Sequence, residues 1–342
     1  MAEPFARDLR DRPATIKDVA KLANVSISTV SRVVNQTGGV SDELTLRIEG
    51  AISALRYRSN GVARALRVNA TRLLGFIVPS VANPTFGALA QSVEQTANER
   101  GYSTILCNSG GSVDNEVRYL RLLIKQQADG ILFNSMGIYD QRLANLTNSG
   151  IPVVVVGRKI PGLPTTNVTT NNRQGAFDAV SYLINKGHRR IAFVFGVYES
   201  ATALEDRYDG YKDALRQYRV PFDERLVVKV PNVLDSAEEA ARRLIDSGVA
   251  FDGVFASNDL IALSVIKNLE RMGFRVPNDV CVMGYDMIPF SQMRYPALST
   301  VDSHLDQLGR EATIQLIGLA EGMADNHSET VVKSEIVLGG TA

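Results

Sequence analysis

The sequence is poor in the features that mark extracellular and membrane proteins. It has only two cysteines in 342 residues, Cys107 and Cys281, far apart within apolar runs. Such cysteines are typical of buried free thiols in a reducing compartment, so no disulfide framework is expected. The longest apolar stretches, such as 151–156, are far shorter than the roughly 20 residues that span a bilayer. Residues 1–13 contain no apolar segment of a secretory signal, so we expect a cytoplasmic protein with no membrane partner.

Net charge is also absent, because 37 basic residues balance 37 acidic ones. Taken alone, this balance argues against a nucleic-acid partner. The charges are distributed unevenly, however, since residues 12–68 hold nine basic and only four acidic side chains. The rest of the chain is correspondingly acidic. This asymmetry indicates a small basic head and a larger acidic body with different partners.

The motifs of the common enzyme classes are missing as well. There is no P-loop, no G-x-G-x-x-G run and no set of metal ligands at a recognisable spacing. His188 is interpreted as structural, and neither His304 nor His327 has a metal-spaced partner in the sequence. We therefore expect no enzyme activity, no metal and no cofactor.

What is present at the N-terminus predicts three short helices. Thr15 and Asp18 form a capping-box pattern, and Asn24 can take the left-handed conformation that a tight turn requires. Ser26 then caps a second helix and Ser41 a third. Two short helices joined by about three residues and covered by a third make a helix-turn-helix module. A generic three-helix bundle is the alternative, but it does not explain the small hydroxyl side chains and the arginine on the second helix.

From residue 73 onward, short β-rich segments alternate with helical ones. The predicted strands span 73–79, 103–108, 130–134, 153–157, 190–195, 254–257, 280–285 and 331–338. The predicted helices span 86–100, 114–127, 172–186, 204–218, 236–247, 259–272 and 304–321. This alternation predicts parallel sheets in α/β layers. About 270 residues is long for one open sheet, so we expect two lobes with a ligand cleft beside the carboxyl ends of their strands.

The N-terminal motif resembles a known family. Residues 15–35 match T-I-x-D-V-A-x-x-A-G-V-S-x-x-T-V-S-R-V-L-N, the DNA-binding head of LacI-type (LacI/GalR) bacterial transcription regulators, at nearly every fixed position. Asn24 replaces the turn glycine and Val34 replaces a leucine. Residues 57–66 resemble the family's hinge, Y-x-P-N-x-x-A-R-x-L, with Ser59 in place of the proline.

Five further motifs resemble the family's effector-binding core and follow in the family's order. They are Asn171-Asn172-Arg-Gln-Gly175-Ala176, Gly187-His188-Arg189-Arg190-Ile191, Arg207-Tyr-Asp-Gly210-Tyr211, Ala256-Ser-Asn258-Asp259 and Gly284-Tyr285-Asp286. The resemblance implies an N-terminal all-α helix-turn-helix head and a two-lobed α/β core with parallel sheets, like that of periplasmic binding proteins. The expected parts are a head at 13–59, a hinge helix and linker at 60–71, and a core at 72–342. Its first lobe would comprise about 72–170 and 302–331, and its second 171–301 and 332–342.

The second helix of a helix-turn-helix places its N-terminal residues on base edges in the major groove. The candidates for reading bases are therefore Ile27, Ser28 and Arg32. Isoleucine can contact the methyl group of thymine, serine can hydrogen-bond to purines or pyrimidines, and arginine can bind guanine. Phosphate contacts are expected from Thr15, Ser26, Thr29, Ser31 and Asn35. For any one of these hydroxyls, a helix cap is the alternative role.

The resemblance implies that the hinge, 60–68, becomes helical only on operator DNA, beside the same segment of a dimer mate. Nine residues are too few for a stable isolated helix in water. The candidate DNA contacts there are Asn60, Ala63 and Leu66, the last as a wedge in the minor groove. A helical linker with a core-facing leucine is the alternative.

For the effector site, the resemblance carries over Phe86, Arg207, Asn258 and Asp286. A ring, a guanidinium, an amide and a carboxylate suit a small polar ligand. The alternatives are a core position for Phe86, a helix cap for Asn258 and a turn cap for Asp286. Arg207 is expected to need an anionic partner, because an arginine that begins a helix opposes the helix dipole. A sugar or sugar acid is the preferred effector, with a purine second.

The sequence thus predicts a DNA-binding transcriptional regulator, a repressor, that binds double-stranded operator DNA as a homodimer. A small-molecule effector would shift its lobes between two arrangements. Two alternatives stay open. One is a two-lobed sugar-binding transport protein, against which the basic head argues. The other is a regulator controlled by a protein partner.

Overall fold

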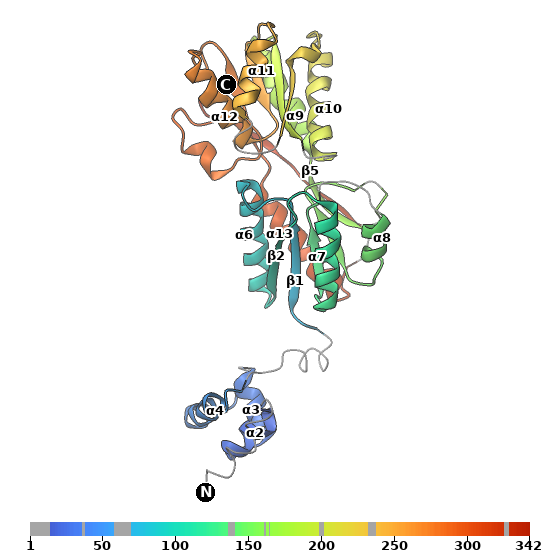
Figure 1. The fold of residues 1–342 in the computed structure, drawn as a ribbon, viewed down its shortest axis with the longest axis vertical. Helices are drawn as coiled ribbons and strands as arrows, with labels where there is room; N and C mark the ends of the chain where they lie inside the picture. Colours follow the sequence, from blue (N-terminus) through green and yellow to red (C-terminus); the bar gives the residue numbers. More distant parts are fainter. Residues whose placement is uncertain are drawn as a thin grey trace. The chain divides into compact units, whose positions relative to one another are not determined.

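A computed structural model describes residues 14–35, 38–57, 70–135, 141–160, 162–163, 165–197, 202–231, 237–324 and 328–342. The chain divides into two compact units, Met1–Thr71 and Arg72–Ala342, called here the head and the core (Figure 1). The predicted hinge contacts Asn60, Ala63 and Leu66 lie outside the described residues. In the part of the chain that the structure describes, every helix is too short or too polar to cross a membrane.

The head contains the three predicted helices, α2 (Ile16–Leu22), α3 (Ile27–Val34) and α4 (Asp42–Ala54). Val19, Val30 and Ile48, one from each helix, are fully buried against one another in a common core. Asn24 has a φ of 52°, which confirms the left-handed residue predicted between α2 and α3. The head therefore owes its shape to three apolar stripes and one tight turn.

Side-chain caps begin α2 and α3 as the sequence predicted, whereas Ser41 stands at the cap position of α4 without a side-chain cap bond, so that part of the prediction was wrong. The Asp18 carboxylate accepts hydrogen bonds from the Thr15 backbone N–H at 2.8 Å and from its hydroxyl at 2.6 Å. The Ser26 Oγ accepts from the Thr29 backbone N–H at 3.1 Å. Each bond satisfies a group that the first turn or its cap would otherwise leave without a partner.

The first lobe of the core is built on a six-stranded parallel sheet, in the order β11-β5-β4-β3-β1-β2. Its early elements are β1 (Leu73–Val78), α6 (Pro84–Glu99), β2 (Ser103–Asn108), α7 (Val113–Lys125), β3 (Gly130–Phe133), α8 (Gln141–Thr147), β4 (Val153–Val156) and β5 (Thr166–Thr170). α13 (Leu305–Ala320) and β11 (Glu329–Val332) complete it from much later in the chain. Neither α8 nor β5 was predicted from the sequence.

The second lobe has a four-stranded parallel sheet, in the order β7-β6-β8-β9. Its elements are α9 (Asn172–Asn185), β6 (Ile191–Val197), α10 (Thr202–Gln217), β7 (Val227–Pro231), α11 (Ala237–Asp246), β8 (Gly253–Ala256), α12 (Asp259–Arg271) and β9 (Cys281–Met283). Short 3-10 turns lie at Glu224–Leu226 and Pro289–Gln292. The predicted α/β alternation is confirmed, although β7 was not predicted.

Both faces of each large sheet are covered by helices, because successive strand residues alternate between two apolar layers. In β4, Val154 and Val156 join the layer under α6 and α13, whereas Val153 and Val155 join the layer with α7 and α8. In the second lobe α11 and α12 cover one face, and α9 and α10 the other.

The chain passes between the two lobes three times, at 170–172, 302–305 and 332–335. The prediction of one strand over 331–338 was wrong at the last of these. β11 belongs to the first-lobe sheet, whereas β12 (Glu335–Val337) pairs antiparallel with β10 (Thr300–Asp302). The break has a physical cause: the Asn171 side chain accepts a hydrogen bond from the Ser334 backbone N–H at 2.7 Å, which takes that amide out of any strand ladder.

Gly210 allows α9 and α10 to approach closely. A Cβ at this position would lie 2.2 Å from the Arg173 carbonyl oxygen and 2.9 Å from the Ala176 Cβ. Glycine within a helix costs about 1 kcal/mol relative to alanine, so packing, and not helix propensity, accounts for its place in α10.

We predict that Gly210→Ala destabilises the core by roughly 1–3 kcal/mol, because the added methyl group overpacks the α9–α10 contact. Gly87→Ala in α6 is the matched control, since nothing lies within 4 Å of a Cβ there, and it should stabilise by up to ~1 kcal/mol. Urea unfolding of both variants measures the difference. Equal stabilities for the two variants would contradict the packing argument.

Candidate functional site

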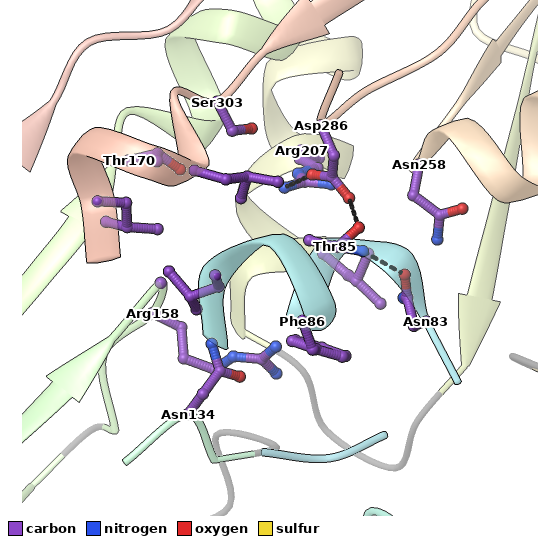
Figure 2. Close-up of a pocket in the computed structure, with 15 residues that line it drawn as sticks. Asn83, Thr85, Phe86, Asn134, Arg158, Thr170, Arg207, Asn258, Asp286 and Ser303 are labelled. Carbon is purple, nitrogen blue, oxygen red and sulfur yellow. Dashed lines mark hydrogen bonds and ion pairs between the residues drawn. The ribbon is translucent and has the colours of Figure 1, made fainter. Parts of the chain in front are cut away.

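A cleft lies between the two lobes of the core, beside the carboxyl ends of their parallel strands. It is lined by residues of both lobes, and the four predicted effector residues Phe86, Arg207, Asn258 and Asp286 all contribute (Figure 2). Further polar side chains in its wall were not predicted, namely Asn83, Thr85, Asn134, Arg158, Thr170 and Ser303. Three of these, Asn134, Ser303 and Asn83, follow directly on a strand or cap a helix, positions at which polar side chains line such clefts.

Arg207 and Asp286 form a buried ion pair in the second-lobe wall. The Arg207 Nη2 donates to the Asp286 Oδ1 at 2.9 Å, and only 11% and 6% of the two side chains are exposed. The Arg207 Nε donates to the Asn172 side chain at 2.9 Å, its Nη1 donates to the Ser257 carbonyl, and the guanidinium lies 3.7 Å from the Tyr285 ring centroid. The guanidinium is therefore fully engaged within the second lobe.

The anionic partner expected for Arg207 is thus Asp286. The prediction that Arg207 begins a helix was wrong, because α10 begins at Thr202 and Arg207 lies in its second turn. Burial, not the helix dipole, accounts for the pairing, since a buried charge is costly without an opposite one beside it.

Asn258 and Phe86 each have the structural role considered as an alternative, and both also line the cleft. The Asn258 Oδ1 accepts from the Ile261 backbone N–H at 2.9 Å and so caps α12, while the same side chain lines the cleft. Phe86 is 8% exposed and belongs to the first-lobe core, yet it also contributes to the cleft wall (Figure 2). Both residues are consequently held in place before any ligand arrives.

Asn134 and Ser303 each place in the cleft wall a buried oxygen that has no hydrogen-bond partner among the described residues. The Asn134 Nδ2 donates to the Val156 carbonyl at 3.0 Å, but the Asn134 Oδ1 accepts nothing. The Ser303 Oγ also has no partner. Leaving a buried polar group unsatisfied costs about 1–3 kcal/mol, so a bound molecule with hydroxyl groups would recover that cost.

In the head, α3 presents the predicted base-reading side chains. Ser28 and Arg32 are exposed, and Ile27 is 44% exposed, unusually so for an isoleucine. The hydroxyls of Ser28 and Thr29 each lie 2.7 Å from the Ser26 Oγ. Because the Ser26 Oγ also accepts from the Thr29 backbone N–H, the helix-cap alternative is confirmed for Ser26. Its hydroxyl proton can still be donated to a neighbour or a ligand.

The two remaining candidates on α3 contact each other. The Asn35 Nδ2 donates to the Ser31 carbonyl at 2.7 Å and to its hydroxyl at 3.0 Å. Such bonds at the end of the helix orient both side chains.

Two family models match this chain. Residues 15–60 match the bacterial regulatory proteins of the lacI family, and residues 71–337 match the periplasmic binding proteins and sugar binding domain of the LacI family. The chain belongs to the LacI family. It is a DNA-binding transcription regulator with an effector-binding domain, and the match of the head distinguishes it from a transport protein.

Relatives of this LacI-family regulator match it over most of their length. It is 34% identical over 304 residues to the ribose operon repressor of Halalkalibacterium halodurans, which covers 89% of both chains. It is 35% identical over 298 residues to the catabolite control protein A of Priestia megaterium, which covers 87% of this chain and 90% of the relative. These relatives are regulators of transcription and not enzymes.

Solved structures support the same architecture. A transcriptional regulator, CelR, in complex with cellobiose is 29% identical and covers 96% of this chain and 100% of its own, with a TM-score of 0.74. A lac repressor dimer bound to operator has a TM-score of 0.83 over 96% of this chain and 99% of its own. At 24% identity, the second shows the shared fold alone.

Asp259 anchors the loop that follows β9 and carries Asp286. It is fully buried, and its carboxylate accepts from the Ile288 backbone N–H at 2.9 Å and from the hydroxyls of Ser291 and Thr300. Desolvation by burial raises the pKa of Asp259 to about 7. Three donors on one carboxylate thereby hold the loop against the start of α12.

The fold also gathers three residues for which the sequence showed no common spacing. Ligand atoms of Asp302, His304 and Glu335 lie within 4.8 Å of one another, a neighbourhood that was not predicted from the spacing of these residues in the sequence. The His304 Nδ1 lies 3.3 Å from the Asp302 Oδ2, and its Nε2 lies 3.8 Å from the Glu335 Oε1. With a carboxylate beside each ring nitrogen, the imidazole itself bridges the two acids.

Proposed function

We propose that this LacI-family regulator is a cytoplasmic repressor that binds a pseudo-palindromic operator as a homodimer. We further propose that a sugar or sugar acid in the interlobe cleft controls it. The observation that carries the effector proposal is the pair of buried, unsatisfied atoms, the Asn134 Oδ1 and the Ser303 Oγ, beside Asp286 and Asn258. A polyhydroxy ligand supplies hydrogen bonds for all four side chains.

The aromatic content of the cleft supports a sugar over a purine. Phe86 is the one ring among the described lining residues, and a single ring face suits the C–H face of a sugar. Two solved relatives hold sugars, since one is a complex with cellobiose and another, from Enterococcus faecium and 25% identical, holds ribose. In this proposal Asp286 and Asn258 bind hydroxyls, and Arg207 holds Asp286 in place.

We predict that a thermal-shift screen of neutral sugars, sugar acids and nucleobases gives its largest shifts with a polyhydroxy compound. Asp286→Asn should reduce affinity for that compound by at least tenfold, since a bond to a charged acceptor contributes roughly 1.5–3 kcal/mol. Asp246→Asn, on the exposed side of α11, is the matched control. A screen without any shift would favour the remaining alternative, control by a protein partner.

The DNA-binding proposal assigns base reading to Ile27, Ser28 and Arg32, and phosphate contacts to Thr15, Ser26, Thr29, Ser31 and Asn35. Its support is the exposure of the first three on one short helix, preceded by the tight turn at Asn24. The proposed minor-groove contacts are Asn60, Ala63 and Leu66. The basic side chains of residues 12–68 supply an affinity for DNA phosphates that does not depend on the base sequence.

We predict that Arg32→Ala loses operator specificity and retains weak, salt-sensitive binding. A bidentate arginine–guanine contact contributes about 1–3 kcal/mol of discrimination. The operator is first selected from a random duplex pool with the parent protein, and mobility shifts then compare it with unrelated DNA at two salt concentrations. Arg47→Ala, which removes the same charge from the exposed face of α4, should keep the specificity ratio. An unchanged ratio in Arg32→Ala contradicts the assignment.

Exposed apolar side chains on the core support the homodimer. After the loop anchored by Asp259, Phe290, Met293 and Tyr295 are 51%, 78% and 98% exposed. The edge strand β2 adds Leu106, 45% exposed. Large exposed apolar side chains are expected where a protein interface covers them, and a dimer matches the two half-sites of a pseudo-palindrome.

We predict that Met293→Ser weakens self-association at least tenfold, because it removes apolar area from the proposed interface. Met323→Ser is the matched control, since Met323 is almost equally exposed, at 74% against 78%, but lies beyond the end of α13. Sedimentation equilibrium of both variants over a concentration series gives the dimer dissociation constants. A monomeric parent, or equal constants for the two variants, would contradict the proposed interface.

A further inference from the structure

One hydrogen bond crosses the cleft directly from the first lobe to the buried ion pair of the second. Thr85 is the second residue of α6, and its Oγ1 donates to the Asp286 Oδ2 at 2.9 Å, across 201 positions of sequence (Figure 2). The Thr85 backbone N–H is held in turn by the Asn83 Oδ1 at 3.0 Å. The hydroxyl is thus presented to Asp286 by a capped helix end and not by a free loop.

The acceptor is equally well fixed. Asp286 is 4% exposed, and Arg207 occupies its other oxygen at 2.9 Å. Its backbone has a φ of 105°, in the region that residues other than glycine rarely adopt. The Asp286 N–H donates to the Val301 carbonyl at 2.8 Å. A carboxylate held in this way cannot follow the first lobe if the cleft opens, so opening must break the bond to Thr85.

We propose that Thr85 is an interlobe latch whose hydroxyl stands in for an effector hydroxyl at Asp286. The bond favours the closed arrangement of the lobes when the cleft holds no effector. Effector binding and the latch then stabilise the same closed arrangement. Part of the free energy that favours closure is therefore present before the ligand binds. This role rests on the proposed function only in naming the effector; the contact and its effect on the lobes do not require one.

The size of the effect follows from the chemistry of the bond. A hydroxyl bonded to a buried carboxylate stabilises its arrangement enough to change a two-state ratio by roughly ten- to a hundredfold. Thr85→Val keeps the shape and removes the donor. Thr85→Ser keeps the donor and loses only a methyl group. Thr96→Val is the matched control, because Thr96 is a buried threonine on the same helix, about three turns further on.

The test measures the distance between the lobes directly in the full chain, without added ligand. Spin labels are attached at Glu99→Cys on α6 and Arg216→Cys on α10, both exposed positions. The native Cys107 and Cys281 are buried and so react slowly. Mixing labelled with unlabelled chain suppresses distances between protomers, and pulsed electron resonance then reports the lobe-to-lobe distribution.

Thr85→Val should move the population ratio toward the open arrangement by roughly ten- to a hundredfold, whereas Thr85→Ser and Thr96→Val should match the parent. A distribution for Thr85→Val identical to that of the parent overturns the latch. So does an equal shift in Thr96→Val, which would indicate general loosening of α6. Failure of the sugar screen would refute the proposed effector and leave this measurement intact, so the two proposals fail separately.

Discussion

The buried carboxylate of Asp286 is the constraint around which the core is arranged. A charge with 4% exposure is stable only if partners replace its water, and those partners come from both lobes. Arg207 meets one oxygen and Thr85 the other. Arg207 is in turn held by Asn172 and Ser257, so the ion pair carries little net charge. A ligand therefore meets a preorganised ion pair in the second-lobe wall, which suits hydroxyl groups better than an isolated ion would.

Much of this architecture could be predicted from local sequence pattern, and the exceptions share a cause. The alternation of strands and helices was recovered because most strands are apolar runs, as in β4. β5 reads Thr-Asn-Val-Thr-Thr and has one apolar residue, so its burial depends on neighbours far away in the sequence. The strand over 331–338 is divided by a bond between Asn171 and Ser334. Nothing near Ser334 in the sequence encodes that partner.

The sites show the same division. Arg207, Asn258 and Asp286 were found because each lies in a motif of the family, and the fold brings them into one cleft with Phe86. The Thr85 contact spans 201 positions and exists only in the relative placement of two lobes, which no local pattern contains. In the head, hydroxyls such as that of Ser26 suit two roles at once, because an N-cap accepts from an amide while its proton can still be donated. Sequence alone could not separate the two.

The three passages of the chain between the lobes also set an order of assembly during synthesis. The second lobe is contiguous from α9 to β9, so its four-stranded sheet is complete as soon as residue 283 has emerged. The first lobe begins earlier, but one face of its sheet is covered by α13, whose Leu308 and Leu316 are buried there, and its edge strand is β11. Until residue 320 leaves the ribosome, α6 alone covers that apolar face. The first-lobe sheet, whose synthesis begins first, is therefore completed after the second-lobe sheet.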